Sequence, residues 1–266
     1  MAKMTREQRE KIGETRLLRA LGVLVVANQR TLEQKISDAG PFDQRVDPHI
    51  RTVVRKRLLN EGVIGATNRS SAPWFYAANS NRIAREARIA ELLAVYKPYL
   101  GLGNRIGEVL EIATYRALAM IPRADFSGRF TDLDDHDDST SYHKDEPERH
   151  IGTRSLQGQE LLDFILRTPD AGPLAIECKN VRHWMYPRRP EMKLALRKAL
   201  ALDAVPVLIA RRIPYVTFAV LSKCGFILHQ TYNQLFPAAE AELAAKARDK
   251  TLLGYGLSRM RALQNS

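Results

Sequence analysis

Cysteine is scarce in this 266-residue chain, which contains only Cys178 and Cys224. Two cysteines are too few for a disulfide framework, and their spacing is not that of a zinc site. The most apolar run near the start, residues 21–27, is far shorter than the ~20 residues that a membrane helix requires. Residues 1–11 are rich in charge and lack the apolar stretch of a secretory signal. We therefore expect a soluble, cytoplasmic protein that does not contact a membrane.

Acidic residues are also few relative to basic ones. The chain has 30 aspartates and glutamates against 41 lysines and arginines, a formal net charge of +11. Such an excess is unusual for an enzyme of small substrates and fits a partner that carries many phosphates. Ribosomal and membrane-surface proteins share this balance, so charge alone only favours nucleic acid. The length allows two domains of ordinary size, each able to bury its own core.

The N-terminal part of the chain shows the pattern of three helices followed by a hairpin. Apolar residues recur at three- and four-residue steps in 5–28, and a short helix begins at Thr31. An Asp-Pro pair starts a third helix over 48–60, because aspartate caps free amides and proline fits the first turn. Two short apolar runs around a polar turn, residues 63–76, then predict a two-stranded hairpin.

This order of elements resembles a winged helix-turn-helix domain over residues 1–80, with 48–60 as its recognition helix. The resemblance implies contact with double-stranded DNA. The side chains that we expect to touch DNA from this domain are Arg51, Arg55, Lys56 and, near the tip of the wing, Arg69. A basic surface can equally be an ordinary solvated face, and many winged helices bind only protein, so that alternative stays open.

Residues 81–102 predict a charged amphipathic helix that connects this domain to a second one, 103–266. Residues 124–150 of the second domain carry many acids and few apolar side chains. We therefore expect a mobile insertion there, which either is inert or lies over a basic cleft as an electrostatic gate. Seven-residue intervals separate the histidines of this stretch, His136, His143 and His150. Because that spacing is not a recognised zinc pattern, we favour solvated histidines over a metal site.

The stretch 159–180 predicts a second hairpin, since two apolar runs flank the turn residues 168–173. Side chains alternate between the two faces of a strand. The second strand therefore has an apolar face made by Leu174, Ile176 and Cys178. Its opposite face carries Glu177 and Lys179, an acid and an amine that emerge together.

On the first strand of this hairpin, alternation places Leu162, Phe164 and Leu166 on one face and Asp163 on the other. Asp163 is then expected beside Glu177. An E-x-K sequence by itself is commonly a solvated strand face. The aspartate on the neighbouring strand is what favours a reactive centre.

Two adjacent carboxylates repel each other unless a cation or a proton lies between them, so the pair suits a hard divalent ion such as Mg²⁺. Such an ion would hold a phosphate oxygen and lower the pKa of a bound water, which supplies a nucleophile. Lys179 is placed to orient that water or to offset charge on the phosphorane oxygens. Cys178 would contribute only its backbone carbonyl.

The arrangement of Asp163 and, fourteen positions later, Glu177-Cys178-Lys179 resembles the signature of PD-(D/E)XK nucleases, a family that includes restriction endonucleases and Holliday-junction resolvases. The resemblance implies a helix, a three-stranded meander, a second helix and a further strand between about 103 and 230. The family often has an acid in a G-x-x-x-E pattern on the first helix. Gly107 and Glu111 fit that pattern, and Glu108 is the rival acid. The chain departs from the signature at Leu162, where the family often has proline.

By resemblance, the catalytic residues are Asp163, Glu177, Lys179 and Glu111. The metal ligands are Asp163, Glu177, Glu111 and the carbonyl of Cys178, for Mg²⁺ with Mn²⁺ as a substitute. The side chains after the motif that we expect at nucleic acid are Arg182, Arg188, Arg189 and Lys193. Trp184 either offers a stacking surface to a base or packs at the start of the next helix.

The sequence thus predicts an α/β restriction endonuclease-like core, a mixed sheet flanked by helices, preceded by a winged-helix domain. The expected function is Mg²⁺-dependent hydrolysis of phosphodiester bonds in DNA by an endonuclease, and the resemblance implies a possible homodimer. One alternative is a non-catalytic DNA-binding regulator with a nuclease-like interaction domain. Another is an RNA-processing nuclease, because basic charge does not distinguish the two polymers.

Overall fold

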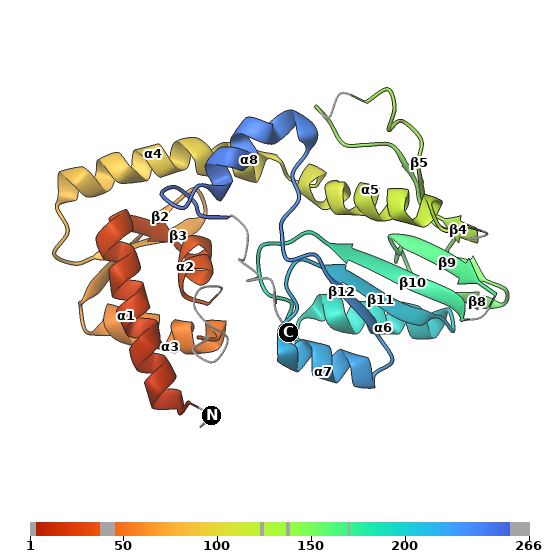
Figure 1. The fold of residues 1–266 in the computed structure, drawn as a ribbon, viewed down its shortest axis with the longest axis horizontal. Coiled ribbons are helices and arrows are strands. Elements are labelled where there is room, and N and C mark those ends of the chain that lie inside the picture. Colours follow the sequence, from red (N-terminus) through yellow and green to blue (C-terminus); the bar gives the residue numbers. More distant parts are fainter. Residues whose placement is uncertain (1–3, 38–45, 123–124, 137–138, 170, 256–266) are drawn as a thin grey trace, which may run out of the picture. The chain divides into compact units, whose positions relative to one another are not determined.

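The computed structural model describes residues 4–37, 46–122, 125–136, 139–169 and 171–255. The chain forms two compact units, one of Met1–Gly101 together with Glu242–Ser266 and one of Leu102–Ala241 (Figure 1). Both helices and sheets are present, so the protein is of the mixed α/β class. We expected the second domain to run to residue 266, whereas the structure groups the residues from Glu242 onwards with the first unit.

The first unit begins with three helices and a small sheet. Its elements are α1 (Arg6–Leu24), β1 (Val26–Asn28), α2 (Gln29–Ile36), α3 (Pro48–Asn60), β2 (Ile64–Arg69) and β3 (Ala72–Ala77). The strands pair antiparallel in the order β1-β3-β2. A capping box formed by Thr5 and Gln8 starts α1, and Pro48 occupies the first turn of α3. Buried aliphatic side chains from all three helices and from the sheet form one core.

Two further segments complete the first unit. Helix α4 (Arg82–Gly101), which we predicted as an amphipathic connector, buries Ile89 and Leu92 and sets the ring of Tyr96 edge-on to Trp74, with centroids 5.3 Å apart. After a 3₁₀ turn (η2, Ala238–Glu240), helix α8 (Ala241–Arg248) leads back to this unit. Beyond α8, the chain is held against the start of α2 by hydrogen bonds, so the first unit contains segments from both ends of the described chain.

The second unit is built on a five-stranded sheet of order β12-β11-β10-β9-β4. Its elements are α5 (Arg105–Ala119), β4 (Asp125–Ser127), β9 (Phe164–Thr168), β10 (Gly172–Lys179), α6 (Pro190–Ala201), β11 (Val205–Ala210), α7 (Tyr215–Lys223) and β12 (Ile227–Gln230). The first three strands form an antiparallel meander, and β11 and β12 continue it in parallel with β10. Parallel neighbours need a crossover, which α6 and α7 supply.

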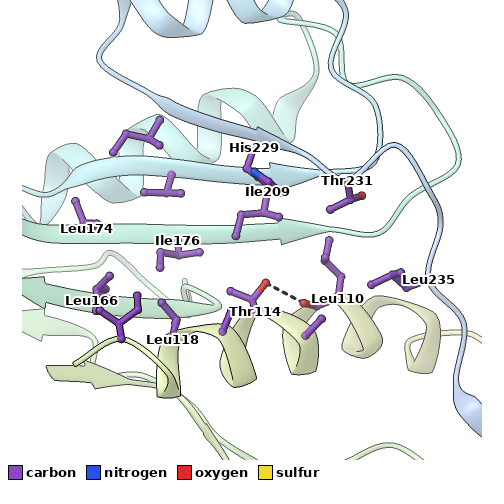
Figure 2. A pocket seen from close by; sticks show the side chains of 15 residues that line it. Leu110, Thr114, Leu118, Leu166, Leu174, Ile176, Ile209, His229, Thr231 and Leu235 are labelled. Atoms are coloured by element: carbon purple, nitrogen blue, oxygen red, sulfur yellow. Dashed lines mark hydrogen bonds between the residues drawn. The ribbon is translucent and has the colours of Figure 1, made fainter. Parts of the chain in front are cut away.

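Helix α5 covers one face of this sheet and α6 and α7 cover the other (Figure 1). On the α5 face, Phe164, Leu166 and Ile176 pack with Leu110. A cavity of about 440 Å³ lies between α5 and the sheet, and its lining is almost entirely aliphatic (Figure 2). The lining joins buried core residues to the exposed side chains of Ile121 and Ile227 and offers little polar surface for charged chemistry.

On the opposite face, Met192 and Ala195 of α6 pack against Leu208 of β11. Leu162 also lies on this face, beside Ile165. The expectation that Leu162 shares a face with Phe164 and Leu166 was therefore wrong. Leu162 precedes the first residue of β9, so strand alternation does not extend to it.

The acidic stretch 124–150 differs from the expected unpacked insertion. Its residues 125–127 form the edge strand β4, and after them come four two-residue strands, β5 (Arg129–Phe130), β6 (Lys144–Asp145), β7 (His150–Ile151) and β8 (Arg154–Ser155). Phe130 is buried, and its ring lies 5.8 Å from that of Tyr115 on α5. Scattered aromatic side chains dock this stretch on the core, although its composition is mostly polar.

None of the helices in the described part of the chain combines the length and the apolar character needed to cross a membrane.

Candidate active site

The hairpin of β9 and β10 brings the sequence-predicted acids together. Asp163 directly precedes β9, and its backbone amide donates to the carbonyl of Ile176 on β10 at 3.1 Å. Gly128 lies close to this position with φ +98°, where a side-chain Cβ would come within 2.8 Å of the Asp163 carbonyl oxygen. Glycine therefore lets the chain after β4 pass close to the start of β9.

One ammonium group joins the two acids. Lys179 Nζ lies 2.7 Å from Glu177 Oε2 and 3.6 Å from Asp163 Oδ2. Asp163 Oδ2 also accepts a hydrogen bond of 2.5 Å from the backbone amide of Cys178. The three side chains thus meet at the end of β10, within the reach of one lysine.

A second lysine, which the sequence did not reveal as part of the site, comes from α6. Lys198 donates to Glu177 Oε1 and also to the carbonyl oxygen of Leu161, at 2.5 Å. Both charged side chains are almost fully buried, with 8% of Lys198 and 6% of Glu177 exposed. Each carboxylate oxygen of Glu177 therefore has its own ammonium partner, and the orientation of this acid is fixed from both sides.

The electrostatics of the site oppose ionisation of Asp163. Burial, together with the negative charges of Glu177 and Glu111, raises the pKa of Asp163 to about 6, although Lys179 opposes the rise. Burial alone would lower the pKa of Lys179, but the carboxylates of Asp163 and Glu177 outweigh it and raise that pKa. Lys179 is therefore a fixed cation and hydrogen-bond donor near neutral pH, not a proton acceptor.

Helix α5 brings both of its candidate acids to the same region. Glu111 Oε2 accepts a hydrogen bond of 2.7 Å from Lys144 of β6, and Glu108 Oε2 accepts one of 3.2 Å from the amide of Tyr142. A polar cavity of about 670 Å³ is lined by both acids, by Lys144 and by Lys179. Glu111 and Lys179 therefore face a common space. Burial would lower the pKa of Lys144, but Glu111, with Asp163 and Glu146, raises it.

Cys178 faces the core, as the strand alternation predicted. Its sulfur lies 3.3 Å from Thr114 Oγ1 of α5, and burial raises the pKa of the thiol. The thiol is therefore neutral, and any contribution of Cys178 to a cation would come from its backbone.

Within the described residues, no three side chains of histidine, cysteine, aspartate or glutamate are grouped so that they could hold a metal ion. His136 stacks on the ring of Tyr142 with centroids 4.0 Å apart, and the His143 amide donates to Asp132. The donor set that fits a divalent ion is the pair Asp163 and Glu177, supplemented by a backbone carbonyl. Burial first, and then the negative charges of Glu177 and Glu111, raise the pKa of Asp163, and a bound divalent ion would act in the opposite direction.

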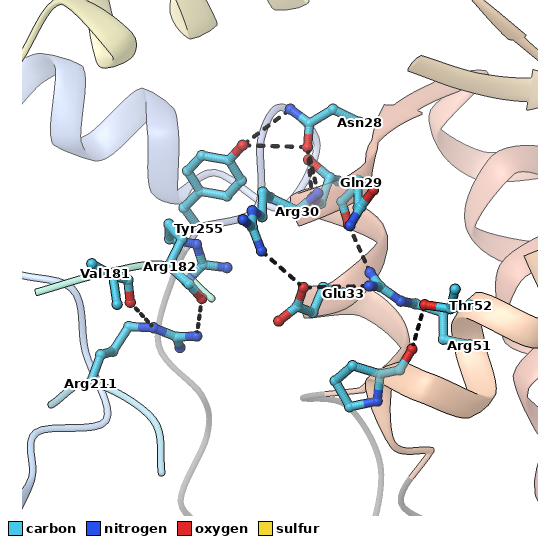
Figure 3. Close-up of polar contacts among 12 residues, drawn as sticks. Asn28, Gln29, Arg30, Glu33, Arg51, Thr52, Val181, Arg182, Arg211 and Tyr255 are labelled. Atoms are coloured by element: carbon cyan, nitrogen blue, oxygen red, sulfur yellow. Dashed lines mark hydrogen bonds and ion pairs between the residues drawn. The ribbon is translucent and has the colours of Figure 1, made fainter. Parts of the chain in front are cut away.

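Two of the arginines expected at nucleic acid are buried. Arg51 is 3% exposed and donates to the Gln29 carbonyl at 2.8 Å and to Glu33 at 3.4 Å (Figure 3). Arg182 is 7% exposed, and its carbonyl accepts a hydrogen bond from Arg211. The expectation that Arg51 and Arg182 touch a nucleic acid is therefore wrong for this structure. The local sequence pattern does not show that other segments pack over these two side chains.

Four of the remaining basic candidates are exposed: Lys56, Arg69, Arg188 and Lys193. Arg55 is half-buried over the ring of Phe75 and donates to Gln29. Arg189 pairs with Glu191 at 3.2 Å. Trp184 is buried, and the guanidinium of Arg212 lies over its ring. Its ring therefore packs inside the protein and is not an exposed surface for stacking with a base.

Lys144 and Lys198 are the two site residues that sequence reasoning missed. Lys198 carries a weak signal, because it is a lysine on the buried side of an amphipathic helix, where a charge requires a partner. Lys144 carries none, since it lies in a polar stretch without periodicity.

No protein-family model, no curated protein and no solved structure matches this chain.

Proposed function

We propose that this chain is a metal-dependent endonuclease of the PD-(D/E)XK kind that hydrolyses phosphodiester bonds in DNA. The observation that carries the proposal is the meeting of Asp163, Glu177 and Lys179 at one end of the sheet, around a single ammonium group. These residue types in this arrangement suit phosphoryl chemistry, because paired acids bind a hard cation and a lysine offsets charge on a phosphate.

The order of elements supports the same proposal. The helix α5, the meander β4-β9-β10, the helix α6 and the parallel strand β11 follow one another as the family resemblance implies. The acids lie on β10 and at the start of its neighbour β9, which is where the family's motif would place them. In the first unit, the order α1-β1-α2-α3-β2-β3 with sheet order β1-β3-β2 supports a winged helix.

The chain's own residues would divide the work as follows. When bound, Mg²⁺ supplies charge neutralisation at the phosphate and a water of lowered pKa. Asp163, Glu177 and the Cys178 carbonyl would hold the ion, with Glu111 on the α5 side. Lys179 stays protonated and donates to a phosphate oxygen as negative charge builds there. Lys198 does not touch substrate, and it keeps the Glu177 carboxylate in position.

The contact with DNA would come from exposed basic side chains of both units. Lys56 lies on α3, the proposed recognition helix, and Arg69 ends β2 at the turn of the proposed wing. In the second unit, Arg188 and Lys193 lie at the start of α6. Contacts of this kind bind phosphates without reading sequence.

A cleavage assay tests the proposal. Purified protein is incubated with supercoiled, linear and branched DNA in Mg²⁺ or Mn²⁺. We expect the wild type to cut at least one form, Asp163→Asn to lose roughly 100-fold or more of the rate, and Asp203→Asn, at an exposed aspartate of the same unit, to cut normally. Failure of the wild type to cut any of these substrates, or equal cutting by Asp163→Asn, would refute the proposal.

One observation favours a second candidate, a non-catalytic DNA-binding regulator. Glu177 and Glu111 are both paired with lysines, and Asp163 lies 3.6 Å from one. A domain in which these ion pairs are permanent would be an interaction module without metal. DNA binding by the wild type without any cutting, and without any divalent-ion binding, supports this alternative. Cutting of structured RNA but not DNA would instead identify an RNA nuclease.

A further inference from the structure

The segment that holds β5 and β6 sends a lysine into the proposed metal site. Lys144 Nζ lies 2.7 Å from Glu111 Oε2, and only 9% of Lys144 and 18% of Glu111 are exposed. The same ammonium lies 4.7 Å from the centre of the Phe164 ring. The contact is thus a mostly enclosed ion pair between α5 and a segment that the chain inserts between the first two strands of its meander.

The Lys144–Glu111 ion pair lies on the α5 side of the proposed metal site, where Glu111 is the candidate ligand. Glu111 is close enough to Asp163 for its charge to oppose ionisation of that acid, so the two carboxylates serve one electrostatic centre. An ion bound by Asp163 and Glu177 would be repelled by an ammonium that remains on Glu111. Lys144 and such an ion therefore compete for the same acid.

Lys144 has a second partner to which it can move. Glu146 Oε2 lies 3.6 Å from its ammonium and is 46% exposed, at the mouth of the polar cavity of about 670 Å³ that both residues line. The cavity also leaves room for the waters that Mg²⁺ keeps when it binds to a few carboxylates. The geometry therefore offers the ammonium one position at Glu111 and another toward solvent.

We propose that Lys144 is a built-in counter-cation of Glu111 and that a divalent ion must displace it before the site is complete. This inference rests on the proposed function, since it concerns the same site. In this role the inserted segment supplies the positive charge that neutralises Glu111 until the metal ion replaces it.

Binding of Mn²⁺ alone, measured by titration calorimetry and by the electron paramagnetic resonance of the free ion, tests the inference without any nucleic acid. The variants are Lys144→Met, which keeps the length of the side chain and removes its charge, and Lys223→Met, at an exposed lysine in the same unit that has no place in the proposed site. We expect Mn²⁺ to bind Lys144→Met about tenfold more tightly than the wild type, with little change for Lys223→Met. If Lys144→Met does not fold, as judged by circular dichroism, Lys144→Gln replaces it.

A second pair of proteins shows whether Lys144 acts through Glu111. In a Glu111→Gln background, adding Lys144→Met should raise Mn²⁺ affinity by clearly less than it does in the native background, because the contested carboxylate is gone and only the direct repulsion of the ion is removed. Equal or weaker binding by Lys144→Met in the otherwise native protein overturns the inference and leaves the nuclease proposal standing. An equal gain with and without Glu111 also overturns it. No Mn²⁺ binding by any of the proteins refutes both the inference and the proposed function.

Discussion

Asp163 is held in surroundings that resist its negative charge. Its carboxylate accepts the amide of Cys178, which favours ionisation, but burial and the charges of Glu177 and Glu111 act more strongly in the opposite direction. At functional sites, binding groups often carry a charge that their surroundings disfavour, and the bound ligand then stabilises that charge. For Asp163 the conflict gives the protein a measurable response to pH.

In the absence of divalent ions, we expect the native protein to gain stability relative to Asp163→Asn as the pH falls. The folded pKa of about 6 exceeds the ordinary value of 3.8. Between those two values the folded chain therefore binds a proton that the unfolded chain releases, and stability rises as the pH is lowered through this window. The difference in unfolding free energy, Asp163→Asn minus wild type, should be largest near pH 7 and shrink by up to about 3 kcal/mol by pH 4.

Urea denaturation in chelator at several pH values between 4 and 8 measures this difference. Asparagine does not titrate, so the other carboxyl groups contribute similarly to both proteins. A difference that stays constant over the whole range would show that Asp163 ionises as readily in the folded chain as in the unfolded one.

Single residues were predicted well where a short-range rule applied. Strand alternation placed the thiol of Cys178 toward the core, and the turn residues predicted the hairpin in which Asp163 lies near Lys179. The lysines that complete the site were not predicted, because Lys144 and Glu111 meet through tertiary packing that no local pattern encodes. Arg51 was assigned to DNA for a similar reason, since burial by Gln29 and Glu33 of α2 is invisible on a helix considered alone.

Among the elements, α6 has a double function. It covers one face of the sheet through Met192 and Ala195, and from the same side it sends Lys198 to Glu177 and to the carbonyl of Leu161. A charged group on the packed side of a helix is tolerated only if it is paired. The position of α6 and the charge of the site are therefore coupled.

Lys198→Met should destabilise the protein by about 3–5 kcal/mol, the usual result of removing one partner from a buried ion pair. Glu177 would keep Lys179 but lose the ammonium at its other oxygen. Urea denaturation at pH 7 measures the change, and Lys193→Met, exposed on the same helix, should change stability by less than about 0.5 kcal/mol. Equal stability of the two variants would mean that Lys198 is not a structural partner of Glu177.

The elements themselves were largely predictable. The helix expected at 48–60 has those bounds as α3, and the second helix that the resemblance implied after the hairpin is present as α6. The acidic stretch was predicted wrongly, because composition averages over many residues. A few aromatic side chains, Phe130 among them, are enough to dock a polar segment when a core is available to receive them.

At the scale of the whole molecule, the excess of positive charge has a consequence for binding. Four candidate contacts with exposed side chains, Lys56, Arg69, Arg188 and Lys193, allow four phosphates to be neutralised. Release of counterions from four phosphates gives a slope of roughly −3.6 in a plot of log affinity against log salt, so the affinity for duplex DNA should fall about 100-fold between 50 and 200 mM salt. Fluorescence anisotropy with a labelled duplex measures it.

The control for this measurement is removal of one contact. Lys56→Met should weaken binding for all sequences and reduce the slope by roughly one. An affinity that does not respond to salt would argue against phosphate contacts as the basis of binding, and so against nucleic acid as the partner of this surface.

The division into two units was only partly visible in the sequence. The change from a helix-and-hairpin pattern to a strand-rich one marked the boundary near residue 102. The return of the chain after α8 had no signature, because it depends on contacts between residues more than 220 positions apart, such as Thr31 with Leu253. Long-range pairing of this kind has no local periodicity to reveal it.

That return has a consequence during protein synthesis. The hydroxyl of Tyr255 bonds to the side chain of Asn28, which caps α2, and Thr31 donates to the Leu253 carbonyl at 2.7 Å. Because a nascent chain leaves the ribosome from its amino end, residues 28–31 wait for their partners until the Leu102–Ala241 unit has already emerged. The second unit is therefore free to fold first, and the first unit reaches its final form only after residues 253–255 have followed it out of the ribosome.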